Sequence, residues 1–274
     1  MAVLLIGYDV ECMTPGSDTT KKFLDAALAV HSQHQAPCSL FVVGKTLEFN
    51  TDALKAAAES GIFDIQSHTY SHVLLKTVCQ FDGHKTTVFR AGSPQRIKRE
   101  VTLGLQVIRL VLGVEPIGLT TPFGYYRGLS DRPDLLRFLY KNGIRFVRSY
   151  ARNEYDWQPV ELNVQPFTYA PQGFPAMLEI PVHGWQDCLW RQEHGWSDAG
   201  GFEDYQVSLL EEAAEKDLVL SLAYHDWSAI REDPAMGIID ALLSRARELG
   251  VRIMSYSEYY NERMRVLNQS NSVV

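Results

Sequence analysis

Imidazole and carboxylate side chains occur where apolar runs of the sequence end, and these groups could bind a metal ion and transfer protons. His68 and His72 lie four residues apart in DIQSHTYSH. On one turn of a helix this spacing points both imidazoles the same way, so that they can share a metal ion. Asp9 and Glu11 follow the run VLLIGY. In an extended chain they face the same side, which allows one to bind a metal ion and the other to accept a proton.

A third group of this kind follows the apolar run LVLSLAY, where His225 is succeeded by Asp226. If the three runs are parallel strands, their carboxyl ends meet in one crevice. An HxxxH spacing on its own is more often a pair of surface histidines, and two neighbouring acids more often face water in a loop. Their occurrence at three strand ends favours a single site over these alternatives.

The elements that would position these groups follow a regular alternation of short apolar runs and helical patterns, which is typical of βα units around a mostly parallel sheet. Glycine stands between a helical pattern and the next apolar run at four positions, as a left-handed C-cap does: Gly61, Gly113, Gly143 and Gly250. The expected strands are residues 3–8, 39–44, 62–66, 116–120, 144–149, 178–182, 218–224 and 251–256. The expected helices lie near 19–36, 46–60, 97–112, 131–142, 203–216 and 234–249.

This pattern predicts one α/β domain over residues 1–274, because no Pro-rich or Gly/Ser-rich linker divides the chain. Two segments depart from the alternation. Residues 77–96 show little periodicity, and residues 151–202 are rich in Pro, Trp, Tyr and Gly. A long irregular segment in a compact domain usually covers a functional site or modifies a repeat of the fold, so we expect a lid-like insertion near 151–202.

Composition excludes several classes of protein. The chain has 33 acidic and 26 basic side chains, a net charge of −7, which argues against a general nucleic-acid binder. The apolar share of 46% and the charged share of 22% are those of an ordinary globular protein. The sequence has no apolar run of the roughly 20 residues that a membrane span needs and no signal-peptide pattern, so we expect a cytoplasmic protein without membrane partners. Four scattered cysteines without a CxxC pair predict free thiols.

Taken together, the motifs resemble the polysaccharide deacetylase family, also called carbohydrate esterase family four or the NodB homology domain, over nearly the whole chain. DIQSHTYSH resembles the H-[ST]-x-x-H metal motif of the family, and GYDVE is similar to its first motif. LTTPFG resembles the R-x-P-[FY]-G motif, and SLAYHDW resembles the late L-x-x-H motif. The resemblance implies a distorted (β/α) barrel of about seven parallel strands, with the site at their carboxyl ends.

The resemblance also implies roles for individual residues. Asp9 would be the general base and His225 the general acid. Glu11, His68 and His72 would bind a divalent metal ion, for which zinc is the expected ion.

The expected substrate-binding residues lie around this centre. Pro122 and Phe123 belong to the matched motif and would shape the substrate groove. We further expect Tyr125 to line the mouth of the groove and Trp185 to belong to an aromatic lid. Asp226, or another carboxylate, would orient the ring of His225.

Two positions depart from the family pattern. The metal-binding carboxylate is usually Asp and is Glu11 here, and the Arg that usually steadies the base is Thr120 here. A neighbouring side chain must therefore replace that Arg, or the base is tuned differently. The spacing of Asp9 and Glu11 and the segment LEIPVHGW resemble the cytosolic subgroup with allantoinase-like, cyclic-imide-hydrolysing and peptidoglycan-deacetylase-like members. This subgroup resemblance favours a homo-oligomer.

We therefore expect a metal-dependent hydrolase of a non-peptide C–N bond that deacetylates an N-acetylated sugar or a related small amide. One alternative is a cyclic amide or ureide hydrolase of the allantoinase or cyclic imidase type. Another is a noncatalytic carbohydrate-binding relative. The lid-like insertion predicts a closed pocket, and hence a small-molecule or short saccharide substrate rather than a polymer.

Overall fold

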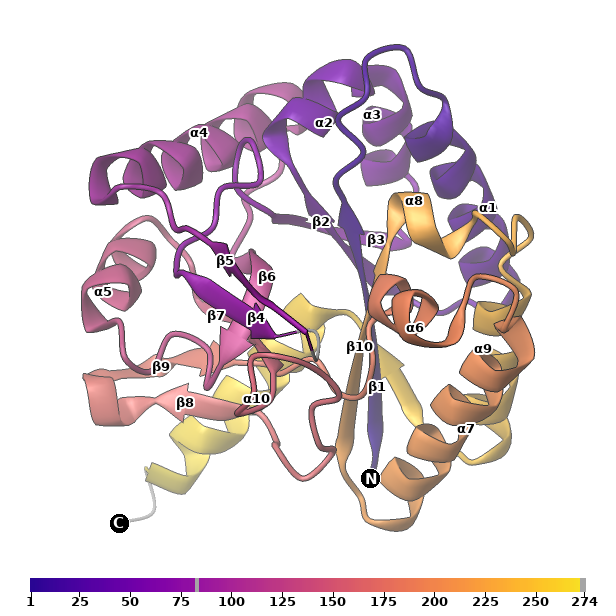
Figure 1. The fold of residues 1–274 in the computed structure, drawn as a ribbon. Helices are drawn as coiled ribbons and strands as arrows, with labels where there is room; N and C mark the ends of the chain where they lie inside the picture. Colours follow the sequence, from indigo (N-terminus) through magenta and orange to yellow (C-terminus); the bar gives the residue numbers. More distant parts are fainter. Residues whose placement is uncertain (82–83, 272–274) are drawn as a thin grey trace.

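The computed structural model describes residues 1–81 and 84–271 and has the α/β architecture expected from the sequence. Its main sheet is largely parallel and curls into a distorted barrel with helices on the outside (Figure 1). Within the described residues the strand order is β10-β1-β2-β3-β6-β7-β9-β8, with β11 paired to β1 and a separate β4-β5 hairpin. The strands are β1 Val3–Val10, β2 Cys38–Val42, β3 Phe63–Ser67, β4 Val78–Phe81, β5 Thr86–Phe89, β6 Gly118–Tyr126, β7 Phe146–Arg152, β8 Phe167–Tyr169, β9 Phe174–Glu179, β10 Val219–His225 and β11 Arg252–Met254.

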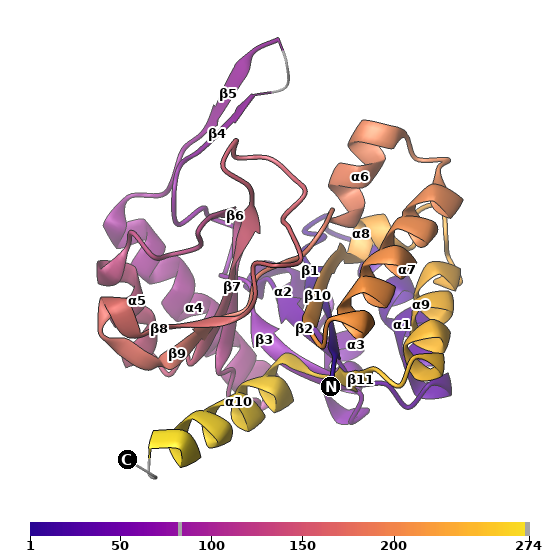
Figure 2. The same cartoon turned by 90° about the horizontal axis from the view of Figure 1, so that it is seen from below.

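The helices follow the strands on the outer face of the barrel. Helix α10 runs beneath the end of the barrel at which the N-terminus lies (Figure 2). They are α1 Thr19–Gln33, α2 Gly44–Phe49, α3 Thr51–Glu59, α4 Pro94–Leu112, α5 Pro133–Lys141, α6 Asp187–His194, α7 Ala199–Glu215, α8 Asp226–Ala229, α9 Gly237–Glu248 and α10 Tyr256–Asn271, with a 3₁₀ turn at Ala170–Gln172. In the described part of the chain, none of the helices has the length and apolarity needed to cross a bilayer.

Alternation along β1 explains why an acid reaches the inside of the barrel. Leu4, Ile6 and Tyr8 face the outer helices and belong to the large cluster beneath them. Val3 and Leu5 belong to a second cluster, which Tyr256 of α10 completes. Residues 7 and 9 continue this inner face, so the apolar plug at the lower end of the barrel is followed by Gly7 and then Asp9 at the upper end.

The barrel is completed on one side by an extended segment rather than by a strand pair. After β9 the backbone continues along β7, where Ile180 N–H donates to Val147 O (2.9 Å) and Val182 N–H donates to Tyr150 O (2.8 Å). His183 N–H then donates to Ser221 O of β10 (2.8 Å). Residues 180–183 therefore connect the two sides of the barrel beside the carboxyl ends of its strands.

All eight expected strand regions overlap a strand, although only the first two residues of 178–182 belong to β9. The four expected C-cap glycines have positive φ values between 67° and 92°. The expected helix at 46–60 is two helices, α2 and α3, that meet at Asn50. Residues 151–202 are not a lid alone, because β8 and β9 of this segment belong to the main sheet. The residues of the segment that line the pocket lie at its start, at Ala151 and Arg152, and after β9. The four cysteines are free, as expected.

Candidate active site

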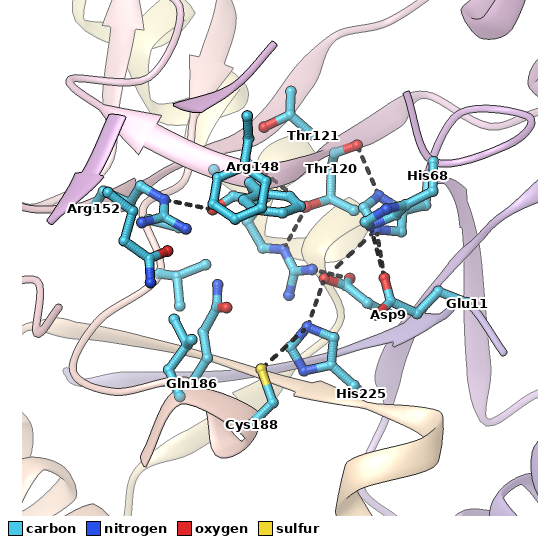
Figure 3. A pocket seen from close by; sticks show the side chains of 18 of the residues that line it. Asp9, Glu11, His68, Thr120, Thr121, Arg148, Arg152, Gln186, Cys188 and His225 are labelled. Atoms are coloured by element: carbon cyan, nitrogen blue, oxygen red, sulfur yellow. Dashed lines mark hydrogen bonds and ion pairs between the residues drawn. The ribbon is translucent and has the colours of Figure 1, made fainter. Parts of the chain in front are cut away.

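A pocket of about 420 Å³ lies at the carboxyl ends of β1, β3, β6, β7 and β10 (Figure 3). One side carries the polar groups Asp9, Glu11, His68, His72 and His225, all of which the sequence singles out. The remaining walls combine apolar side chains (Phe89, Phe123, Val182, Leu189 and Trp227) with polar ones, among them Gln80, Arg152, Gln186 and Gln192. The structure thus brings together the five residues expected to carry the chemistry.

Asp9 is the central carboxylate of this pocket and is 5% exposed. It pairs in register with His225 of the neighbouring strand β10. Its Oδ1 accepts a hydrogen bond from Nη2 of Arg148. Its Oδ2 lies 3.9 Å from Nε2 of His68 and 4.0 Å from Nε2 of His225. One carboxylate oxygen is therefore held by a cation, while the other faces the two imidazoles.

Arg148 takes the place of the motif Arg that is missing at Thr120. The two residues are register partners on β7 and β6, and Arg148 Nε donates to Thr120 Oγ1 (3.1 Å). The guanidinium lies 4.3 Å from the centre of the Phe41 ring. Gly7 leaves room for it, because a Cβ at that position would stand 2.7 Å from Nη1. The cation thus comes from the adjacent strand instead of from the motif itself.

We expect Arg148→Met to lower kcat by about tenfold to a hundredfold, because the Asp9 carboxylate loses the hydrogen bond that holds Oδ1 and leaves Oδ2 facing the two imidazoles. Steady-state rates on the best substrate test this expectation. Arg148→Lys should recover part of the lost rate because it retains the charge. A wild-type kcat in Arg148→Met would show that the action of Asp9 does not depend on Arg148.

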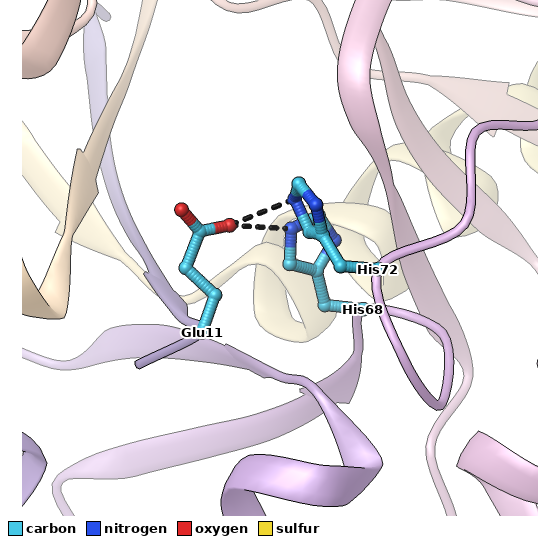
Figure 4. A group of neighbouring side chains, drawn as sticks. All are labelled: Glu11, His68 and His72. Carbon is cyan, nitrogen blue, oxygen red and sulfur yellow. Dashed lines mark hydrogen bonds and ion pairs between the residues drawn. The ribbon is translucent and has the colours of Figure 1, made fainter. Parts of the chain in front are cut away.

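Glu11, His68 and His72 form a compact group whose ligand atoms lie within 4.8 Å of one another (Figure 4). Glu11 Oε2 is 3.3 Å from Nε2 of His68 and 2.8 Å from Nε2 of His72. Burial alone would raise the pKa of the Glu11 carboxyl, but the charge of His225 and the hydrogen bonds of the two histidines hold that pKa well below its usual range. Glu11 is therefore ionised, as a metal ligand must be.

The hydrogen bonding of His68 fits a metal ion at this group. Its Nδ1 lies 3.2 Å from Thr120 O, a carbonyl that can only accept, so we assign a proton to Nδ1. With a cation bound, Nε2 would be unprotonated, and the ion would take the place of the proton that joins Nε2 to Glu11 Oε2 (3.3 Å). A carbonyl that orients a metal-binding imidazole is a common arrangement around zinc.

The spacing of the two histidines suggested a helix, but they lie on a tight turn after β3. Thr69 and His72 have φ values of 63° and 59°, in the left-handed region. The turn is held by Glu100 of α4, which accepts from the backbone N–H and the hydroxyl of Ser71 (2.7 and 2.8 Å). Gly104 permits this packing, since a Cβ there would lie 2.8 Å from the carbonyl carbon of Thr69. The left-handed residues turn both imidazoles toward Glu11.

His225 is oriented by Asp187 of the insertion and not by Asp226, the residue expected for this role. Asp187 Oδ1 lies 2.6 Å from His225 Nδ1, and Oδ2 accepts from the His225 backbone N–H (3.0 Å). Burial lowers the pKa of His225, but Cys188, Asp187 and Glu11 together raise it well above 6.5. With Nδ1 donating to Asp187, Nε2 is the proton-bearing atom that faces Asp9 and the pocket.

Asp226 does not orient His225 and is not among the pocket-lining residues. It is fully buried below the pocket, where it accepts from the backbone N–H groups of Glu11 and Cys12 (3.2 Å each) and from the hydroxyl of Thr20 (2.7 Å). Burial raises the pKa of Asp226 to about 6. Its contacts fix the loop that carries Glu11.

Of the other expected substrate-binding residues, one lines the pocket and three do not. Phe123 lines the pocket, whereas Pro122, Tyr125 and Trp185 are not among the lining residues. Tyr125 is buried, and its hydroxyl accepts from Leu75 N–H (2.8 Å). Trp185 packs in an aromatic cluster of the insertion, with ring centres 6.2 Å from Trp157 and 6.4 Å from Trp190. These bulky side chains are held in apolar layers behind the pocket wall.

Several pocket residues were missed by the sequence analysis, among them Arg148, Arg152, Gln186, Cys188 and Trp227. Trp227 was detectable, because it directly follows the HD pair and its Nε1 donates to Glu11 Oε1 (3.0 Å). The arginines of β7 and the start of α6 carried no motif. Their positions depend on strand register and on the path of the insertion.

A family model described as polysaccharide deacetylase matches residues 14–145. Among solved structures, a putative polysaccharide deacetylase from Mycobacterium smegmatis is similar to the chain, with a TM-score of 0.69, 17% identity, and 97% of this chain and 91% of that chain covered. A probable polysaccharide deacetylase from Pseudomonas aeruginosa PAO1 has a TM-score of 0.70 and 14% identity, with coverages of 96% and 91%. Puue allantoinase has a TM-score of 0.71 and 14% identity, with coverages of 95% and 89%. At these identities the structural likenesses show the fold. Among curated proteins, none is significantly similar to the chain.

Proposed function

Since the chain belongs to the polysaccharide deacetylase family, we propose that it is a metal-dependent hydrolase that releases acetate from an N-acetylated sugar or a related small amide. The observation that carries this proposal is the presence of two separate sets of residues in one pocket. Glu11, His68 and His72 form a metal-binding group, and Asp9 and His225 stand beside it as a base and an acid. Metal-assisted amide hydrolysis uses both sets, the metal ion on the carbonyl and the acid and base on the protons.

Glu11, His68 and His72 would hold the divalent ion, and zinc suits a set of two imidazoles and one carboxylate with room for further ligands. When bound there, the ion would polarise the substrate carbonyl and increase the acidity of water. Hydrogen bonds from neighbouring groups orient these metal-binding side chains. Thr120 O fixes the ring of His68 (3.2 Å), and Trp227 Nε1 fixes the carboxylate of Glu11 (3.0 Å).

Asp9 would accept the proton of the attacking water at Oδ2, since Oδ1 is occupied by Arg148. His225 would donate a proton from Nε2 to the departing nitrogen, because Asp187 holds Nδ1 and the raised pKa keeps the ring protonated near neutral pH. The 4.0 Å between Asp9 Oδ2 and His225 Nε2 lets both groups reach the same carbonyl centre.

The pocket supports a small substrate. Its volume of about 420 Å³ lies in the range of small-molecule sites. Phe89 of the β4-β5 hairpin and Phe123 of β6 pack against each other on one side, with ring centres 4.8 Å apart. The segment after β9 contributes Val182 and Leu189 to the pocket lining. Apolar walls from separate parts of the chain would exclude water from a monomer-sized amide.

Acetate release from N-acetylglucosamine oligomers of one to six units tests the proposal, with allantoin and succinimide as cyclic amides in the same panel. We expect the zinc-loaded protein to act on the monomer or dimer with no further gain beyond about four units. Activity that rises steadily with length, with none on small amides, would point to a polymer substrate. A zinc-loaded protein that turns over no compound in the panel would favour the noncatalytic alternative.

Hydrolysis of a cyclic amide or ureide is a second candidate, and the shape of the pocket favours it. In a cyclic substrate the departing nitrogen remains attached to the product, so the whole ring must lie inside the pocket between the metal group and the apolar walls. The chain also shares the fold of Puue allantoinase. Ring opening of allantoin or succinimide, followed at the loss of ring absorbance, distinguishes this reaction from deacetylation.

Asp187→Asn is expected to lower the maximal rate by about tenfold to a hundredfold and to move the basic limb of the pH–rate profile to lower pH. His225 must be protonated to act as the acid, so activity is lost as the pH rises through its pKa. Removing the Asp187 carboxylate lowers that pKa, and the decline begins earlier. Asp198→Asn, at the N-cap of α7, is the control and should leave the profile in place. An unchanged profile in Asp187→Asn would separate Asp187 from proton transfer.

A further inference from the structure

Arg152 is a cation at the pocket wall that the proposed chemistry does not use. It ends β7, is only 2% exposed, and lies on the opposite side of the pocket from Glu11 and His68 (Figure 3). Its side chain is nevertheless one of those that line the pocket. A buried charge facing a ligand site is costly unless an anion accompanies it.

The protein provides Arg152 with two carbonyl partners and with the face of the Phe123 ring, whose centre lies 5.6 Å from the guanidinium carbon. Nε donates to Phe123 O (3.2 Å) and Nη1 donates to Asp156 O. Across the part of the chain that the structure describes, no carboxylate lies within ion-pair distance of this guanidinium. Asp156, the nearest acid in the sequence, forms no ion pair with Arg152, and its Oδ2 accepts from Cys79 N–H (3.0 Å). Burial lowers the pKa of the Arg152 guanidinium, and the charge of Asp156 offsets this effect only in part.

Arg148 on the same strand provides the comparison. It is equally buried, but its charge is neutralised by Asp9. The charge of Arg148 is therefore already paired with a carboxylate, whereas the charge of Arg152 is available to a substrate. Beside Arg152, Gln186 lines the same end of the pocket with an amide side chain that can donate to an oxygen ligand (Figure 3).

We propose that Arg152, assisted by Gln186, binds a carboxylate of the substrate, so that the hydrolysed compound is a small N-acyl or cyclic amide that carries one carboxylate at the end remote from the metal group. One guanidinium matches one carboxylate in charge and in planar geometry. This inference deepens the proposed function and rests on it for the identity of the amide end only.

The spacing of Arg148 and Arg152 along β7 indicates how long such a substrate must be. Arg148 and Arg152 are four residues apart on β7, which separates their Cα atoms by roughly 13 Å. Arg148 reaches inward to Asp9, where the reacting carbonyl would lie. A carboxylate at Arg152 would therefore be several bonds from the amide, which favours a chain of three or more carbons between the two groups.

Binding of paired probes to the zinc-loaded protein tests the proposal by calorimetry. The probes are N-acetylglycine, N-acetyl-β-alanine, 4-acetamidobutanoate and 6-acetamidohexanoate, each measured beside its carboxamide. We expect the wild type to bind the best carboxylate about tenfold or more tightly than its carboxamide, with one of the longer tethers preferred. This ratio tests the proposal without any variant. A ratio near one for every pair, or no carboxylate binding at millimolar concentration, would overturn it.

Variants assign the preference to Arg152. In Arg152→Gln the ratio should fall to about one, in Arg152→Lys it should fall only in part, and in the exposed Arg127→Gln it should remain at the wild-type value. A preference that persists in Arg152→Gln would mean that the carboxylate binds elsewhere, for example to zinc, and would also overturn the proposal.

Acetate release from the same probes separates this inference from the proposed function. Arg152-dependent binding of carboxylates without any hydrolysis would retain the carboxylate site and reject the hydrolase. Equal hydrolysis of carboxylates and carboxamides would retain the hydrolase and reject the carboxylate site.

Discussion

Replacement of Asp9 by asparagine is expected to reduce kcat by about a thousandfold or more while the protein keeps its metal ion. The amide cannot accept the proton of the attacking water, and Asp9 does not belong to the group formed by Glu11, His68 and His72. Turnover of the best substrate in the panel and zinc content by atomic absorption are the two measurements. An Asp9→Asn protein that retains more than about a tenth of the wild-type rate would remove Asp9 from the proton transfer.

The same substitution affects stability, and this effect can be separated from catalysis. Asparagine leaves the buried charge of Arg148 without a counter-charge, which is expected to cost about 3 kcal/mol of unfolding free energy in urea. The double variant Asp9→Asn/Arg148→Met removes both charges and should recover much of that loss, but none of the activity. Asp25→Asn is the matched control, because Asp25 pairs with Lys21 on the surface and should change stability by less than about 0.5 kcal/mol.

Replacement of His72 by alanine is expected to weaken zinc binding by about a hundredfold or more and to abolish turnover at micromolar zinc. His72 is the better position for this test because its side chain is 22% exposed, whereas that of His68 is 1% exposed and its removal would leave a hole in the core. Zinc affinity by competition with a chelator and activity during zinc titration are the measurements.

The control for His72 is His194→Ala, which removes an exposed histidine that packs against Trp190, with ring centres 3.9 Å apart, and does not line the pocket. It should bind zinc as the wild type does. Full zinc content in His72→Ala after dialysis, or no zinc binding by the wild type, would contradict the assignment of Glu11, His68 and His72 as ligands. Partial recovery of turnover in His72→Ala at high zinc concentration would support it, because the remaining ligands still form part of the site.

Much of the fold could be predicted from the sequence because it depends on short-range patterns. The apolar runs, the helical periods and the glycines between them mark the βα units, and each expected strand region overlaps a strand. The same reasoning placed Asp9, Glu11 and His225 at one edge of the sheet, since the carboxyl ends of parallel strands meet there. The HxxxH spacing identified His68 and His72, although the left-handed residues Thr69 and His72 that turn them inward had no visible signal.

Only the tertiary structure decided the partners of these residues, because those partners come from pairings across strands and from the irregular insertion. The register of β6 against β7 sets Arg148 opposite Thr120, and a shift of one residue would have turned it outward. Asp187 reaches His225 through the path of residues 180–187, which no periodicity describes. Asp226, adjacent to His225 in sequence, instead faces away into the loop of Glu11. Local patterns thus determined which groups approach the site, whereas the charge and proton held by each group depended on neighbours brought close only by folding.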